Sequence, residues 1–242
     1  PQWCYSRYDG ERWILDMDHY KLSDMPLDEQ IELITNSTHF LNSLLTRKVS
    51  AFRAGGYSIE NYSDLADVFL KNGIRVDSSV LRGDYSNSKY QSYDYRVVPH
   101  KTSYFFSNNP KIEDKGESRE FPISTIVVPS FIYLINRMKK HKEYSDIIEA
   151  KHKWGDGVGI GYAGNKSQVF FNKLKRFIGY KTIRASIDVG VDLERVYNYS
   201  KKHYEGDEFV IIGHPKAISP FTVKVLERFI VNHPEIEFQT FS

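Results

Sequence analysis

Short apolar runs alternate with amphipathic segments along most of this 242-residue chain, and this alternation limits the fold more than any other feature. Repeated strand–helix units of this length indicate a parallel sheet, either open or closed into a barrel. The fold class is therefore α/β. We expect strands over residues 49–52, 74–80, 121–128, 185–189 and 209–212, and helices over residues 27–45, 62–71, 131–151, 166–177, 193–203 and from residue 220 onward.

Local signals mark several helix boundaries. Asn72-Gly73 is a pair that ends helices, and Ser219 followed by Pro220 is typical of a helix start. In the first helix the apolar side chains recur three or four residues apart, which predicts one apolar face. That face comprises Leu27, Ile31, Ile34, Leu41 and Leu45.

The alternation breaks between residues 82 and 120, where tyrosine, serine and asparagine dominate. We interpret this segment as a surface excursion containing a hairpin built from residues 95–99 and 103–107. The glycine-rich residues 155–164 predict a loop, and 236–241 a last strand or a tail. Because no linker or internal repeat divides the chain, we expect a single domain over residues 1–242.

Composition excludes several classes of protein. A formal net charge of +2 gives no electrostatic reason to expect a nucleic-acid partner. No apolar run approaches the roughly 20 residues of a membrane helix. The only cysteine, Cys4, permits neither an intrachain disulfide nor a thiolate zinc site. We expect a cytoplasmic protein, although the start at Pro1 leaves open an N-terminal signal further upstream.

Arg53 lies where the strand over residues 49–52 ends, and two glycines, Gly55 and Gly56, follow it with Tyr57. The guanidinium keeps its charge, and glycines let the backbone approach a bound group closely. Backbone amides after a strand end would stabilise the oxyanion of a tetrahedral intermediate. The alternative interpretation makes Arg53 a structural ion-pair partner at the rim of the sheet.

His214 directly follows the apolar strand over residues 209–212, so we expect it at the same edge as Arg53. An imidazole there would act as a general acid, a general base or a metal ligand, or would simply bond a neighbouring carbonyl. Asp77 lies on the strand that follows Arg53. It would either orient the guanidinium through a two-pronged contact or bond its own neighbour Ser79.

Four short segments together resemble the polysaccharide deacetylases of carbohydrate esterase family 4, especially members from bacterial surface-polysaccharide gene clusters. They are residues 52–59 (FRAGGYSI), 73–80 (GIRVDSSV), 120–124 (EFPIS) and 213–216 (GHPK). The resemblance implies a distorted parallel (β/α) barrel of about seven strands. It implies a metal-dependent hydrolase that removes an acetyl group from an N-acetylated or O-acetylated sugar.

The resemblance also implies roles for the matching residues. His214 would be the general acid, Arg53 the cation that orients the base, and Gly56 the amide donor to the oxyanion. Gly55, Tyr57 and Asp77 would complete the oxyanion or substrate site. The family uses a divalent metal, usually zinc, to polarise the acetyl carbonyl and activate water.

The paired aspartates and the metal-binding histidines of the family are missing from this chain. Residues 1–3 (PQW) resemble those that follow the histidine motif, so we expect a chain that lacks the first one or two strands. The metal ligands are then expected upstream of Pro1, and this fragment alone is expected to be inactive. The oxyanion assignment also departs from the family, whose proline-rich third motif is replaced by residues 54–56 (AGG).

Two other functions are open. A catalytically inactive relative with the same fold would bind a saccharide without hydrolysing it. The tyrosines and phenylalanines, with tryptophan 14% of the chain, suit stacking on sugars as well as half-buried strands. A nucleotide-sugar transferase on a doubly wound sheet would need a diphosphate-binding strand–glycine–helix turn, and no segment gives a convincing one.

Overall fold

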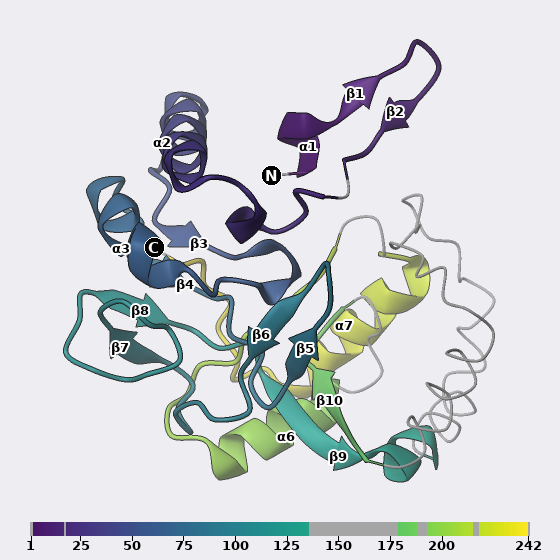
Figure 1. Ribbon diagram of the computed structural model, residues 1–242. Coiled ribbons are helices and arrows are strands. Elements are labelled where there is room, and N and C mark those ends of the chain that lie inside the picture. The colour runs from purple at the N-terminus through teal and green to yellow at the C-terminus, as the bar shows by residue number, and fades with distance from the viewer. Residues whose placement is uncertain (1, 17, 136–178, 188–192, 215–217, 242) are drawn as a thin grey trace. The chain divides into compact units, whose positions relative to one another are not determined.

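The chain forms two compact units in the computed structural model shown in Figure 1. The first unit comprises Pro1–Pro122 with Gln239–Ser242, and the second comprises Ile123–Phe238. Whether the chain is one domain stays a prediction. The structure describes residues 2–16, 18–135, 179–187, 193–214 and 218–241.

A four-stranded sheet forms the centre of the first unit, with strand order β3-β4-β8-β7. Strands β3, β4 and β8 run parallel, and β7 runs antiparallel to β8. The bounds of these strands are Ala51–Phe52 for β3, Val76–Asp77 for β4, Tyr104–Phe106 for β7 and Ser118–Glu120 for β8.

The predicted seven-stranded parallel barrel is wrong. The described strands form separate sheets of two to four strands, and none of these sheets closes into a barrel. A parallel return requires a crossover of a dozen or more residues, usually a helix. Between β7 and β8 the chain instead makes tight turns, in which Asn109 Oδ1 accepts from the Lys111 amide and Asp114 Oδ1 from the Gly116 amide. The strand that follows therefore pairs antiparallel.

Helix α3 (Tyr62–Lys71) has the predicted bounds and packs on the sheet. Its buried side chains are spaced three, one and three residues apart, as one helix face requires. Gly73 ends the helix with φ of +78°, and its amide donates to Leu70 O at 3.0 Å. The face comprises Tyr62, Leu65, Ala66 and Phe69, which share a core with Ile34, Ala54, Ile59, Ile74 and Phe106.

Helix α2 (Leu27–Leu44) forms where predicted, but it buries a different face. Gln30, Ile34 and Thr38 are its buried residues, whereas Leu27 and Leu41 are exposed. Gln30 explains this rotation, because its side-chain amide donates to Met25 O at 2.7 Å and accepts from the Asn61 side chain. A buried polar side chain requires such partners.

The hairpin predicted within residues 82–120 lies elsewhere. Strands β5 (Tyr85–Asn87) and β6 (Ser92–Asp94) form it, while residues 103–107 contain β7, whose partner is β8. The turn is closed by the Ser88 amide donating to Gln91 O at 2.7 Å. The other elements of the first unit are α1 (Gln2–Tyr5), β1 (Arg7–Tyr8), β2 (Trp13–Ile14), η1 (Leu22–Asp24) and η2 (Gly55–Tyr57).

The described residues of the second unit include a two-stranded antiparallel sheet, two long helices and a short helical stretch over residues 130–135. Ser219 caps the last helix as predicted, its Oγ accepting from the Thr222 amide at 3.3 Å. Helices α6 and α7 and both strands contribute to one apolar core. The bounds are Thr125–Pro129 for β9, Tyr180–Arg184 for β10, Leu193–His203 for α6 and Pro220–Asn232 for α7.

Other predictions for the second unit are only partly confirmed, or fall on residues that the structure does not describe. The strand predicted over 209–212 appears as a single parallel bridge from Ile212 to Ser186, and residues 236–241 form no strand. Within the predicted helix over 131–151, residues 131–135 are helical. The remainder of that helix, the loop over 155–164 and the helix over 166–177 lie outside the described residues.

Candidate functional site

Three of the motif segments lie side by side at the carboxyl ends of the parallel strands β3, β4 and β8. The Ser78 amide donates to Phe52 O at 3.1 Å, and the Phe121 amide donates to Asp77 O at 2.9 Å. These hydrogen bonds align the chain positions that follow each strand. Arg53, Ser78 and Phe121 therefore occupy equivalent positions just beyond the three strand ends.

The register of the strands determines which residue accepts the hydrogen bonds of Arg53. Phe52, Asp77 and Glu120 are register partners, so their side chains share one face of the sheet. Arg53 is one position further along and belongs to the opposite face, as does Ser78. Its Nε donates to Ser78 O at 2.9 Å and its Nη2 to Ser78 Oγ at 3.0 Å.

Arg53 remains a cation with an exposed surface. Partial burial lowers the pKa of its guanidinium, against the opposing effect of the nearby Tyr57, Asp77 and Glu120. In the described hydrogen bonds of this side chain the acceptor is Ser78, not the Asp77 carboxylate. Arg53 is thus held at the edge of the sheet by neutral oxygen atoms, and its charge is available to an anionic group.

Asp77 is fully buried and bonds its neighbour Ser79, which was one of the two interpretations open for it. Ser79 Oγ donates to Asp77 Oδ2 at 2.7 Å, and the Ser79 amide donates to Oδ1 at 3.2 Å. The same Oγ accepts from the Ala54 amide at 2.8 Å. Asp77 therefore fixes the chain just before the glycine turn rather than contacting solvent.

Glu120 is a second fully buried carboxylate, beside Asp77 in the sheet register. Its Oε1 accepts from the Val80 amide at 3.1 Å, and its Oε2 is buried with no hydrogen-bond partner among the described residues. Burial raises the pKa of Asp77 to about 7, against the hydrogen bonds from Ser79. Burial, and then the charge of Asp77, raise the pKa of Glu120 well above its usual value. The pair is therefore protonated in part near neutral pH.

The turn η2 carries the residues predicted to hold the oxyanion. The Tyr57 amide donates to Ala54 O at 3.2 Å and the Ser58 amide to Gly55 O at 3.4 Å. The amides of Gly55 and Gly56 precede these donors at the open end of the turn. Gly56 and Tyr57 both have positive φ, of 61° and 63°. The Tyr95 hydroxyl donates to Tyr57 O at 2.7 Å and so holds this unusual backbone in place.

Gly56→Ala should destabilise the protein by about 1–2 kcal/mol, because an alanine disfavours this positive φ. Its Cβ would also lie 3.3 Å from Gln91 Cγ. Gly55→Ala is the matched control, since a Cβ at Gly55 meets nothing within 4 Å, and its cost should stay within about 0.5 kcal/mol. Urea unfolding of both variants measures the difference. Equal losses would show that the turn does not need the glycine at position 56.

His214 belongs to the second unit, whereas Arg53 and Asp77 belong to the first. It is exposed and follows Ile212, whose amide donates to Ala185 O at 3.0 Å. Its predicted meeting with Arg53 stays a prediction. Residues 215–217, which complete the GHPK motif, lie outside the described residues.

Sequence reasoning missed Glu120 as a member of this cluster, whereas the bond between Asp77 and Ser79 was one of its two interpretations. Glu120 lies within a segment that carried the family resemblance and is a polar residue at a strand end. The position of Glu120 at the end of a strand was the signal that the sequence offered, because a buried polar group there needs a specific hydrogen-bond partner.

Across the parts of the chain that the structure describes, no three His, Cys, Asp or Glu residues gather closely enough to hold an ion. Among the described helices, none has the length and apolar character needed to cross a membrane.

Comparisons with protein-family models, curated proteins and solved structures give no match to this chain.

Proposed function

We propose that this chain is a hydrolase that removes an acetyl group from an N-acetylated or O-acetylated sugar. One observation carries the proposal. The segments FRAGGYSI, GIRVDSSV and EFPIS, chosen from the sequence alone, have their strand ends aligned at one edge of the four-stranded sheet. In open α/β sheets, ligands bind outside the carboxyl ends of the strands.

The proposed chemistry uses few groups. Water gives one proton to the imidazole of His214 as it adds to the acetyl carbonyl, and the oxyanion that forms is stabilised by the charge of Arg53 and by the amides of Gly55 and Gly56. Tyr57 closes this turn. Asp77 acts as a positioning residue, because Ser79 connects its carboxylate to the Ala54 amide that precedes the turn.

His214 would protonate the leaving amine or alcohol as the sugar departs. The divalent metal implied by the family resemblance stays a prediction, and no step above passes through it. The inactivity that the resemblance implies for this chain by itself is not part of the proposal. A cytoplasmic location likewise stays a prediction.

The test measures acetate release from a panel of N-acetylated and O-acetylated saccharides and nucleotide-linked N-acetyl sugars, with and without added zinc. Arg53→Ala should lower kcat/KM on the order of a hundredfold, because an oxyanion loses its cation. Arg75→Ala is the control, since Arg75 precedes β4 at the opposite strand end and pairs with Glu117 at the surface. It should leave kcat/KM unchanged.

The acetate measurement distinguishes a hydrolase from the main alternative, a saccharide-binding relative without hydrolytic activity. A protein that takes up acetylated sugars without releasing acetate, under either metal condition, is a saccharide-binding relative and contradicts the hydrolase. Equal activity of the Arg53→Ala and Arg75→Ala variants would remove Arg53 from the site.

A further inference from the structure

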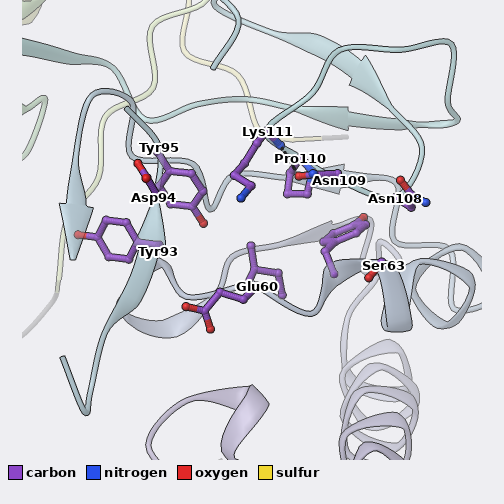
Figure 2. A pocket seen from close by; sticks show the side chains of 11 residues that line it. Glu60, Ser63, Tyr93, Asp94, Tyr95, Asn108, Asn109, Pro110 and Lys111 are labelled. Carbon is purple, nitrogen blue, oxygen red and sulfur yellow. Dashed lines mark hydrogen bonds between the residues drawn. The ribbon is translucent and has the colours of Figure 1, made fainter. Parts of the chain in front are cut away.

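A cavity of about 190 Å³ opens in the first unit at a place that the proposed chemistry does not use. Three segments line it: the start of α3, the end of β6 and the loop over residues 108–111 (Figure 2). Neither Arg53, Asp77 nor Glu120 is among its lining residues. The cavity is therefore a second place where this unit would hold a ligand.

Buried tyrosines give the cavity a fixed aromatic wall. Tyr62, Tyr93 and Tyr95 are exposed by only 3%, 7% and 3%. The rings of Tyr93 and Tyr95 stack with centroids 5.1 Å apart and an interplanar angle of 16°. Their hydroxyls are anchored, Tyr93 to Asp84 Oδ2 at 2.8 Å and Tyr95 to the Tyr57 carbonyl. The wall is thus formed before any ligand arrives, which lowers the entropic cost of binding.

Polar side chains surround this wall. Figure 2 shows Lys111 reaching into the space above Glu60 and beside Tyr95, with Asn108 further along the same loop. Asn109 fixes the loop, because its Oδ1 accepts from the Lys111 amide at 3.0 Å. The rim therefore offers hydrogen-bond donors from Lys111 and Asn108 and acceptors from Glu60 and Asn108.

The charges at the rim argue against an ionic ligand. An anion would meet one ammonium group, on Lys111, but two carboxylates, on Glu60 and Asp94. A metal cation would meet few free ligands, because both oxygens of Asp94 accept from Arg96, at 2.9 and 2.6 Å. A neutral ligand with many hydroxyl groups avoids both problems, since each hydroxyl both donates and accepts.

The size and shape of the cavity restrict the class of ligand further. The cavity is smaller than the roughly 300–1,000 Å³ pockets of drug-sized ligands, so it suits a single ring. Flat aromatic rings on one side and hydrogen-bonding groups on the other match a pyranose, which has an apolar face and polar edges. We propose that this cavity binds one neutral ring of a saccharide, with Tyr93 and Tyr95 as the wall and Lys111 and Asn108 at the rim. The proposal holds whether or not Arg53 takes part in hydrolysis.

The test measures binding of methyl glycosides of neutral hexoses and N-acetylhexosamines by titration calorimetry and saturation-transfer NMR. Lys111→Ala and Asn108→Ala should each weaken binding about five- to tenfold, as loss of one hydrogen bond predicts. Both residues are exposed, so the variants should fold. Lys115→Ala removes an exposed lysine that does not line the cavity and should leave binding unchanged.

Inorganic phosphate and calcium chloride serve as the competing ligands. Phosphate binding that is lost in Lys111→Ala, without binding of any glycoside, would make the cavity an anion site and overturn the proposal. Binding of no glycoside, or equal affinities in all three variants, would overturn it too. Neutral hexose glycosides carry no acetyl group, so their binding should depend on Lys111 and Asn108 whether or not the protein releases acetate, and a failure of the hydrolase proposal can be distinguished from a failure here.

Discussion

Glu120→Gln should make the protein more stable than wild type at pH 8 and bring little or no gain at pH 5. In the wild type, Asp77 and Glu120 are fully buried at paired positions of neighbouring strands. A glutamine is neutral and keeps an oxygen that accepts from the Val80 amide. Its NH2 group would take the place of Oε2, which has no hydrogen-bond partner among the described residues. It would therefore remove a buried like-charge repulsion without leaving a cavity.

The direction of this pH effect follows from proton linkage. The unfolded carboxyls have pKa values of about 4, whereas the folded pKa of Asp77 is raised to about 7 and that of Glu120 is also raised. Between these values the folded protein binds more protons than the unfolded chain, so the free energy of unfolding falls as the pH rises. The stabilisation is complete below about pH 4 and is lost on passing through the folded pKa values.

Urea unfolding at pH 5 and pH 8 measures this effect. Between these pH values the wild type should lose more stability than Glu120→Gln, because only the wild type must release the proton of Glu120. Glu117→Gln is the control, because Glu117 lies just before the same strand with 69% of its side chain exposed. Its stability should change with pH as in the wild type. If the free energy of unfolding of all three proteins changes with pH in the same way, the protonation of Asp77 and Glu120 does not control stability between pH 5 and pH 8.

Phe69→Ala should cost about 3–5 kcal/mol, the largest effect we expect from truncating a side chain. Phe69 is fully buried on α3, with its ring centroid 4.7 Å from that of Phe52 and 5.1 Å from that of Tyr62. Its removal leaves a cavity between the helix and the sheet. The loss would also loosen Phe52, which directly precedes Arg53.

Thermal and urea unfolding of Phe69→Ala give the measurement. Phe40→Ala is the matched control, because the Phe40 side chain lies on α2 with 62% exposure and its loss should cost less than about 0.5 kcal/mol. A Phe69→Ala variant as stable as the control would show that α3 does not pack on the sheet through this residue.

Local signals predicted several of the described helices, among them α3 and α7. Asn72-Gly73 and Ser219-Pro220 set helix boundaries through backbone geometry and capping, which act within a few residues. The same locality placed Arg53 and Asp77 at the ends of neighbouring parallel strands. These features need no knowledge of distant parts of the chain.

Long-range pairing could not be predicted in the same way. The strands β3 and β4 have two residues each, so they carry no period from which a buried face could be inferred. The opposite faces of Arg53 and Asp77, and the pairing of Asp77 with Glu120, depend on register. Nothing in the local sequence of β7 shows that it runs antiparallel to β8. The barrel was inferred from the family resemblance and not from these pairings.

The proposed function assigns Arg53 and His214 to one reaction, and a double-mutant cycle on acetate release tests this proposal most directly. It compares kcat/KM of the wild type, Arg53→Ala, His214→Ala and the double variant. Residues of one site should each cost on the order of a hundredfold, and the double variant should lose little more than the worse single variant. Losses that multiply in the double variant, or no loss from His214→Ala, would contradict the account.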